Sequence, residues 1–334
     1  MTSPYPLQCR PILMHKVWGG DRLARFGKDC PAGATIGESW EAADLDATSA
    51  SGAGGGAQRS VVVNGALAGK TLGDAVRTWG AGLLGAARPT GSGGFPLLVK
   101  FLDARENLSI QVHPSPAYAA AHPGAHLKTE CWYILDAAPG SVLYKGLRPG
   151  ETRESLAARV RDGTVVEALR ACPAKPGEIH NLPSGTVHAL GAGVLVAEVQ
   201  TPSDTTFRLY DWGRSGRELH IDQCLACVDL APPPPEMVLR SAGDGFGPTL
   251  RTDFFRVRHL SLGSGQERPL EPDGRCAVVM VLAGAGSLYH EDGAYAPTDV
   301  AVGQTFVVPA GVSAETTACA ADDARLECLV ATVG

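Results

Sequence analysis

The sequence predicts a mainly β protein made of two β-sandwich or barrel units with short helical insertions. Its apolar residues come in short runs of strand length, such as Pro96–Phe101 and Val194–Val199, separated by turn-forming residues. Glycine and proline contribute 41 and 24 of the 334 residues, so the chain can make many turns. A chain of this length is sufficient for two domains, because one domain commonly has roughly 100 to 200 residues.

Further strand-like runs are Leu108–Val112, Cys131–Leu135, Val278–Leu282 and Thr305–Val308. Two segments are instead predicted to be helical. In residues 71–88, Thr71 can cap a helix and Asp74 follows three residues later, as in a capping box. In residues 151–172, apolar residues recur at helical spacing. We expect both helices to be insertions into a β scaffold.

Two segments of biased composition predict a loop and a domain boundary. Residues 51–57 (SGAGGGA) have too few side chains to pack a core, which predicts an exposed loop. Pro232–Pro235 are consecutive prolines, which cannot continue a helix or a central strand and favour a stiff, extended spacer. We therefore expect one domain over residues 1–231, with the helical insertions, and a second over residues 232–334.

A faint internal repeat relates the two predicted domains. Ile134–Tyr144 is similar to Val281–Tyr289, and Leu182–Leu190 is similar to Val308–Glu315. Each copy combines a strand, a glycine turn, a second strand and a Pro-x-Gly turn, an arrangement typical of the cupin jelly roll. We therefore expect two cupin domains.

Polar side chains concentrate in strand-like segments of the first domain, where a sandwich normally carries apolar residues. Gln111 and His113 are two residues apart, so on a strand they point to the same face. With Glu130 and His188 they form a set of nitrogen and oxygen ligands suited to zinc or another borderline divalent ion, with room left for water or substrate. From spacing alone, however, a Gln-x-His pair on a strand is more often a hydrogen-bonded structural pair.

The second copy of the repeat lacks such side chains. Ala314 occupies the position that matches His188, and an alanine, about Ala277, occupies the position that matches Glu130. We therefore expect the second cupin domain to be metal-less and the chemistry to take place in the first.

Several motifs, in their order and spacing, resemble type I mannose-6-phosphate isomerases, or phosphomannose isomerases, in their short bacterial form. The motifs are QVHP (111–114), KTECWYILDAAPGS (128–141), LPSGTVHALGAG (182–193), TTFRLYDWGR (205–214), KVWGGDRLARFG (16–27), GESWE (37–41) and VVNGALAGKTLGD (62–74). They cover most of residues 10–215. The resemblance implies an isomerase that interconverts D-mannose 6-phosphate and D-fructose 6-phosphate by zinc-assisted proton transfer through a cis-enediol.

The resemblance also implies the metal ligands. One zinc ion per chain would be held by Gln111, His113, Glu130 and His188.

Two catalytic residues follow from the same resemblance. Arg208 would lie beside the reacting carbons and Lys128 in the active site; without the resemblance, Lys128 would be an ordinary solvated lysine and Arg208 a salt-bridge partner of an aspartate. The group that takes the C2 proton stays open among a lysine of lowered pKa, a zinc-bound water and a carboxylate such as Glu198.

Lys100 and Ser109 are implied to hold the sugar phosphate, since an ammonium and a hydroxyl suit phosphate oxygens. Trp40 and Glu198 are candidates to contact the substrate, although a Trp in a sandwich is more often a core residue and a strand Glu can serve only to orient its neighbours. Glu38 is a further candidate for lining the pocket. The other histidines, among them His15 and His220, are assigned no role in the site.

Composition limits the partners. The net charge of -6 and the pI of about 5.9 give no overall attraction to nucleic acid or to a membrane surface. No uninterrupted apolar run reaches the roughly 18 residues of a membrane span. Nine scattered cysteines fit a reducing compartment. We expect a cytoplasmic enzyme, a monomer or weak homodimer, whose partner is a small sugar phosphate. A cupin phosphoglucose isomerase and a non-catalytic regulatory cupin are the alternatives.

Overall fold

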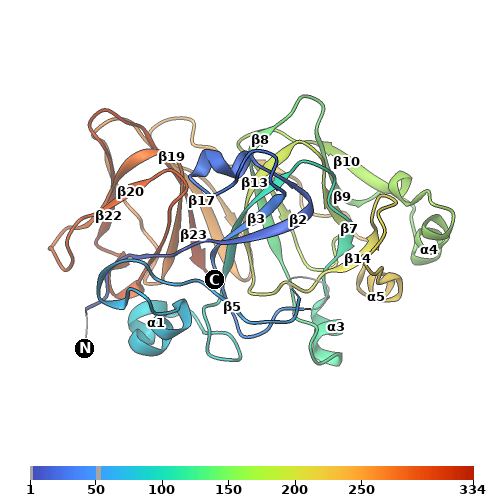
Figure 1. Cartoon of the computed structure of the whole chain (residues 1–334), viewed down its shortest axis with the longest axis horizontal. Helices are drawn as coiled ribbons and strands as arrows, with labels where there is room; N and C mark the ends of the chain where they lie inside the picture. The colour runs from blue at the N-terminus through green and yellow to red at the C-terminus, as the bar shows by residue number, and fades with distance from the viewer. Residues whose placement is uncertain (1–2, 50–53) are drawn as a thin grey trace.

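The computed structural model describes residues 3–49 and 54–334 and has two β halves that lie side by side (Figure 1). Most of its regular structure is strand, and the paired strands of the described residues run antiparallel. The predicted mainly β class is therefore confirmed. None of the helices in this part of the chain is long and apolar enough to cross a membrane.

The first half contains two sheets that face each other. The central sheet has the order β15-β11-β8-β13-β6-β2-β3, with β2 (Ile12–Gly20), β3 (Ile36–Ala42), β6 (Leu98–Ala104), β8 (Glu130–Ala137), β11 (Glu178–Leu182), β13 (Val194–Gln200) and β15 (Met237–Val238). The outer sheet has the order β10-β9-β12-β7-β14, with β7 (Ile110–Val112), β9 (Val142–Leu147), β10 (Leu169–Pro173), β12 (His188–Leu190) and β14 (Phe207–Tyr210). Leu102 and Trp132 of the central sheet share a buried core with Leu143 and Leu190 of the outer sheet.

The second half is built on the C-terminal sheet. Its strands are β1 (Leu7–Gln8), β16 (Gly245–Arg251), β17 (Phe255–Leu262), β18 (Glu267–Pro269), β19 (Ala277–His290), β20 (Thr298–Ala301), β21 (Thr305–Val308), β22 (Thr316–Ala320) and β23 (Leu326–Val333). Strand β19 shifts register between Val281 and Ala283, pairing first with β21 and β23 and then with β20 and β22. This long strand therefore curls the sheet around a core of its own.

The predicted helix at residues 71–88 is present as α1 (Leu72–Trp79) followed by α2 (Ala81–Leu84). The Thr71 hydroxyl accepts a bond from the Asp74 amide at 3.1 Å, and the Asp74 carboxylate accepts one from the Thr71 amide at 2.9 Å. The capping box is therefore confirmed.

The prediction of a helix over residues 151–172 is correct only for its first part, α4 (Arg153–Arg161). Gly163 has a φ of +73°, a left-handed conformation that ends the helix, and the chain continues through a 3-10 turn (Val165–Ala168) into β10. With α5 (Ile221–Cys227), α4 packs on the face of the outer sheet that points away from the central sheet (Figure 1).

The remaining short helices are α3 (Pro116–Ala121), α6 (Ala310–Ser313) and 3-10 turns at Arg22–Phe26 and Gly65–Leu67. A small ribbon pairs β4 (Asp44–Leu45) with β5 (Gln58–Arg59).

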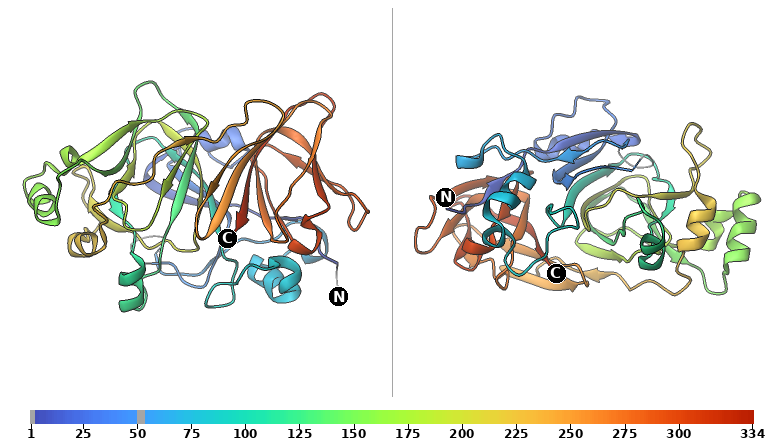
Figure 2. Two further views of the ribbon diagram at one scale, coloured as in Figure 1. Left: turned by 180° about the vertical axis from the view of Figure 1, so that it is seen from behind. Right: turned by 90° about the horizontal axis from the view of Figure 1, so that it is seen from below.

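The central sheet is buried on both faces. Successive side chains of a strand point to opposite sides, so in β6 Lys100 and Leu102 face the outer sheet while Val99 and Phe101 pack against the C-terminal sheet. Views from behind and from below show the same contact between the halves (Figure 2). The central sheet thus links the interior of the first half to the second half.

One strand from each predicted domain pairs with a sheet of the other half. β1 pairs with β21 of the C-terminal sheet, and β15, which follows the prolines, pairs with β11 of the central sheet. The division between residues 231 and 232 stays a prediction. Of the loop predicted at 51–57, residues 51–53 lie outside the described residues and residues 54–57 are exposed.

The proline segment packs on Gly146, which has a φ of +75°. A Cβ at this position would lie 2.5 Å from Pro233 Cδ, whereas Gly150, with a φ of +90°, has no atom within 4 Å of an added Cβ. We expect Gly146→Ala to lower the free energy of unfolding by about 1–3 kcal/mol more than Gly150→Ala, because only the former adds a collision to the backbone strain. Chemical denaturation of both variants measures this difference; equal losses would contradict the packing of Pro233 on Gly146.

Candidate active site

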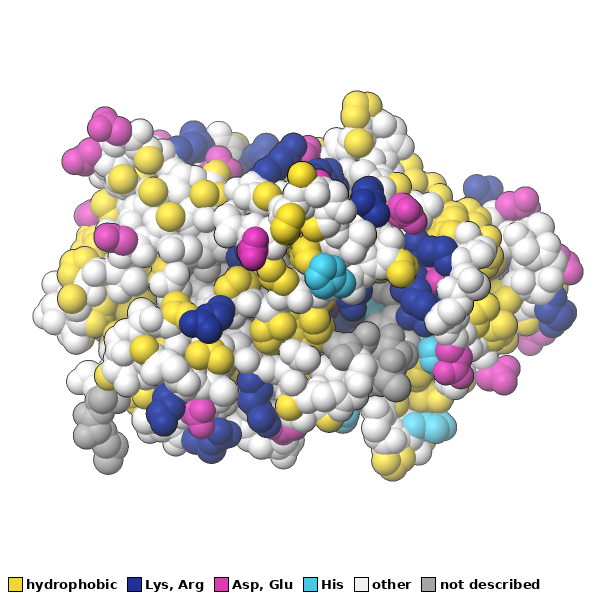
Figure 3. Space-filling model, viewed as in Figure 1, with side chains coloured by type: hydrophobic (Ala, Val, Ile, Leu, Met, Phe, Trp, Pro, Cys, Tyr) yellow, Lys and Arg dark blue, Asp and Glu magenta, His cyan; other side chains and the backbone are white. Residues whose placement is uncertain are grey.

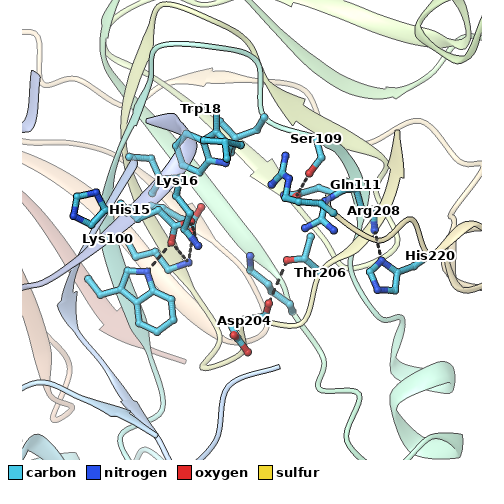
Figure 4. A pocket seen from close by; sticks show the side chains of 18 of the residues that line it. His15, Lys16, Trp18, Lys100, Ser109, Gln111, Asp204, Thr206, Arg208 and His220 are labelled. Carbon is cyan, nitrogen blue, oxygen red and sulfur yellow. Dashed lines mark hydrogen bonds and ion pairs between the residues drawn. The ribbon is translucent and has the colours of Figure 1, made fainter. Parts of the chain in front are cut away.

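A pocket of about 450 Å³ lies between the central and outer sheets and opens beside β2 and β14. Figure 3 shows the surface hollowed in this region, with Lys and Arg side chains beside the hollow. Figure 4 shows Lys16 and Lys100 on one side of the pocket and Ser109, Gln111 and Arg208 on the other. The pocket is therefore lined with charge on two opposite walls.

Three buried side chains form a compact set behind the pocket lining, in contact with the lining residues Gln111 and Lys128. His113 follows β7, Glu130 begins β8, and His188 begins β12. Their potential ligand atoms all lie within 4.8 Å of one another, and the Glu130 carboxylate is 3.3 Å from His113 Nε2 and 3.2 Å from His188 Nε2. The two sheets thus bring together three residues that are far apart in sequence.

The hydrogen bonds of these residues fit a metal ion. His113 Nδ1 is 3.0 Å from the Thr205 carbonyl oxygen and His188 Nδ1 is 2.8 Å from the Thr186 carbonyl oxygen. With Nδ1–H donating to a carbonyl, each ring directs the lone pair of Nε2 towards Glu130. His113 Nε2 and Glu130 Oε1 are buried and make no hydrogen bond to another described residue.

The protonation states also suit metal ligands, which must be neutral imidazoles and ionised carboxylates. Burial, followed by the charge of Lys128, lowers the pKa of His113 to about 3. Burial acts to raise the pKa of Glu130, but Lys128 and then His113 outweigh it and hold that pKa well below its ordinary value. Lys128 Nζ lies 2.8 Å from Glu130.

Gln111, the fourth predicted ligand, lies next to this set. Its Nε2 is 3.1 Å from His188 Nε2 and its Oε1 is 3.5 Å from the Ser109 hydroxyl. A half-turn of the amide exchanges these two atoms and turns the oxygen towards the ligand set. The structure therefore brings all four predicted ligands together, in a nitrogen and oxygen set that suits a borderline divalent cation.

One wall of the pocket is a row of alternating charges. Lys16 lies 3.2 Å from Glu38, and Lys100 lies 3.5 Å from Glu38 and 3.1 Å from Glu198. Burial opposes the charges, yet Glu198 and Glu38 raise the pKa of Lys100, and Lys16 and Lys100 lower that of Glu38 to about 2. Burial, followed by Glu130, raises the pKa of Glu198.

Two tryptophans fix this row. Trp40 Nε1 donates to Glu38 at 2.6 Å and Trp132 Nε1 donates to Glu198 at 2.9 Å. The Lys100 ammonium also lies 4.9 Å from the centre of a Trp40 ring, a distance typical of a cation–π contact. Trp40 thus both lines the pocket and orients two of its charged residues.

Arg208 of β14 stands on the opposite wall. Its guanidinium donates to the Glu218 carbonyl oxygen at 2.7 Å, and its backbone N–H donates to His220 Nδ1 at 3.3 Å. Burial, followed by Arg217, lowers the pKa of Arg208. The segment after β14 therefore holds the guanidinium against the pocket.

Several pocket residues were assigned no role from the sequence. They are His15, Lys16, Thr206, Arg217 and His220. Lys16 and Trp18 alternate on β2, so the period of two indicates a shared face, but nothing in the sequence says that this face borders a pocket. Arg217 and His220 come from an irregular segment, for which spacing gives no direction.

Comparisons with known proteins agree on one family. The family model described as phosphomannose isomerase type I, catalytic domain, matches residues 6–139. A mannose-6-phosphate isomerase of Streptococcus mutans is 36% identical over 297 residues, which cover 86% of this chain and 87% of that protein.

Solved structures of similar architecture carry the same description. The crystal structure of the mannose 6-phosphate isomerase from Bacillus subtilis matches with a TM-score of 0.81 and 29% identity, covering 98% of this chain and 99% of that one. A mannose 6-phosphate isomerase solved with zinc bound has the same fold, with a TM-score of 0.68 and 18% identity over 98% of this chain and 99% of that one.

We expect His188→Ala, and equally His113→Ala, to weaken binding of a divalent metal by about 100-fold or more, because each removes a predicted ligand. Metal content after dialysis against buffered zinc, measured by mass spectrometry, checks this. His220→Ala is the matched control, since His220 lines the pocket outside the ligand set. Retention of zinc by the His188 variant would contradict the ligand assignment.

Proposed function

The chain belongs to the type I phosphomannose isomerase family and is a mannose-6-phosphate isomerase, and from this premise we propose that it moves the proton between C2 and C1 through a cis-enediol with the help of zinc. The observation that carries the proposal is that Lys128 and Arg208 line one pocket, while Lys128 Nζ lies 2.8 Å from Glu130, a member of the His113, Glu130 and His188 set. Aldose–ketose isomerisation needs positive charge where the enediolate oxygens develop.

Gln111, His113, Glu130 and His188 would hold one zinc ion per chain. Two imidazoles, a carboxylate and an amide oxygen are ligands that zinc accepts, and a catalytic site keeps a further position open. When bound, zinc supplies a Lewis acid that polarises substrate oxygens without redox chemistry. Support comes from the orientation of both imidazoles by the Thr186 and Thr205 carbonyls.

The remaining catalytic work falls to residues of the chain. Arg208 and Lys128 supply positive charge to the enediolate from two directions. The acceptor of the C2 proton would be a group that lines the pocket, and both Lys128 and Glu198 do so. The raised pKa of Glu198 favours this carboxylate as the base, whereas Lys128 Nζ is engaged with Glu130 at 2.8 Å.

We assign substrate contacts to Trp40, Lys100, Ser109 and Glu198. Ser109 and Lys100 would hold the phosphate, with a hydroxyl and an ammonium as donors. Lys100 shares its charge with two carboxylates, so its attraction for phosphate is weaker than that of an unpaired lysine. Lys16 and Arg217 also line the pocket, but each is paired with a carboxylate, Glu38 and Asp211 respectively, so their attraction for phosphate is reduced in the same way.

We further propose that the chain is a bicupin. Residues 1–231 would form the catalytic cupin domain and residues 232–334 a metal-less one, in which Ala277 and Ala314 replace two of the ligands. The antiparallel sheets of each half, each with an interior core, support this division. A cytoplasmic location and a monomeric or weakly dimeric state stay predictions from the sequence.

We expect the purified protein to convert mannose 6-phosphate to fructose 6-phosphate, to lose this activity on chelation and to regain it with zinc. A coupled assay for fructose 6-phosphate measures this, with glucose 6-phosphate as a parallel substrate. Activity with glucose 6-phosphate alone would favour a phosphoglucose isomerase. No turnover despite bound metal would favour a non-catalytic sugar-binding role.

We expect Arg208→Ala to lower kcat/KM by about 100-fold or more, because it removes a charge aimed at the developing enediolate, while zinc content stays at the wild-type level. Steady-state kinetics and metal analysis on the same sample check both parts. Arg251→Ala, which removes an exposed arginine of β16, is the control. Loss of zinc from the Arg208 variant would contradict a purely catalytic role.

A further inference from the structure

The two faces of strand β3 border different parts of the molecule. Glu38 and Trp40 line the pocket, whereas Ser39 and Glu41 point to the other side of the central sheet. All of residues 36–42 are buried, so neither face touches solvent. A shift of this strand would therefore move the pocket wall and the contact between the halves together.

Glu41 is the centre of a buried polar cluster on the second face. Its carboxylate accepts bonds from the Lys28 ammonium at 2.8 Å, the Ser39 hydroxyl at 2.6 Å and the Thr305 hydroxyl at 3.2 Å. Lys28 also donates to the Gly303 carbonyl oxygen at 2.7 Å. Thr305 belongs to β21 and Gly303 to the turn before it, so this cluster joins β3 to the C-terminal sheet.

The surroundings of the cluster are apolar. Val99 and Phe101 of the central sheet meet Met280 and Val307 of the C-terminal sheet in one continuous core. The Lys28 and Glu41 side chains are only 4% and 1% exposed. Apolar residues of similar volume often stabilise such a site at least as well as a buried ion pair, because burying two charges costs much of what their attraction returns. A contribution to stability alone therefore gives a weak reason for this cluster.

The directional hydrogen bonds of the Glu41 cluster do fix the position of β3 relative to the C-terminal sheet. An apolar contact tolerates sliding, whereas a carboxylate with three donors fixes the strand that carries it. On the pocket side of that strand, Glu38 receives the Trp40 indole N–H and pairs with Lys100, which in turn pairs with Glu198. The position of β3 is thus transmitted to four charged or aromatic residues of the substrate pocket.

We propose that Glu41 is a positioning residue, which ties β3 to the C-terminal sheet through Lys28 and Thr305 and so sets the substrate-binding wall formed by Glu38 and Trp40. The proposal rests on the proposed function, since it concerns binding of mannose 6-phosphate in this pocket. It gives the C-terminal sheet a part in the reaction, although the described residues of that sheet contain no candidate group of metal ligands.

Thr305→Val tests this link with a change of almost no volume. We expect the KM for mannose 6-phosphate to rise about fivefold, the effect of one lost hydrogen bond, with zinc content unchanged and kcat altered less. Loss of folded protein would instead lower the maximal rate at constant KM. Thr332→Val is the matched control, because Thr332 is a buried threonine of the same sheet on β23 and, among the described residues, no side-chain hydrogen bond joins it to β3.

The double variant Lys28→Met/Glu41→Met separates positioning from stability. Removing both charges leaves no unpaired ion, although the Ser39 and Thr305 hydroxyls and the Gly303 carbonyl lose a partner. The unfolding temperature should therefore fall less than in Glu41→Met alone, while the KM rises as in the Thr305 variant. A wild-type KM in both variants, or an equal rise in the Thr332 control, would overturn the proposal.

Failure of the proposed function would be seen separately, as a wild-type chain without turnover. The link is then measured by calorimetric titration of mannose 6-phosphate into the same four proteins. A dissociation constant that weakens about fivefold in the Thr305 and double variants, but not in the control, supports positioning of the wall. Equal constants in all of them would overturn it.

Discussion

The burial of both faces of the central sheet is the constraint on which this molecule depends. Strand residues alternate between two environments, and here neither is water: one is a charged pocket and the other an apolar contact with the C-terminal sheet. A strand such as β6 therefore supplies a charged pocket residue on one face and apolar residues on the other. Lys100 between Val99 and Phe101 is the clearest case.

Charges placed in such a sheet must be compensated locally, because water cannot do it. Lys100 lies between Glu38 and Glu198, and Lys128 lies beside Glu130. The same pairing keeps Glu130 ionised and His113 neutral, the forms that a divalent metal needs. The same ion pairs therefore compensate the buried charges of the fold and set the protonation states of the candidate metal ligands.

Sequence patterns predicted the parts of this arrangement that depend on local spacing. Gln111 and His113 share a face because they are two residues apart, and Thr71 caps α1 because Asp74 follows at the required distance. The predicted helix at residues 151–172 is too long because Val165 continues the apolar spacing of Leu156 and Val160 beyond Gly163, whose left-handed backbone ends α4. The pairing of Lys100 with two glutamates, and the position of Arg217 at the pocket, depend on contacts between distant strands and loops, which no local pattern contains.

The same constraint gives the second half a task, although its described residues contain no candidate group of metal ligands. Val99, Phe101, Tyr133 and Val199 would form an exposed apolar surface if the C-terminal sheet were removed, and such a surface is rarely left in water. To cover this surface, the C-terminal sheet needs apolar side chains on one face only. The residues inside the second half need not include metal ligands. In the proposed bicupin, alanines at positions 277 and 314 would therefore cost no function where the repeat would place ligands, provided that the covering sheet keeps β3 and its neighbours in place.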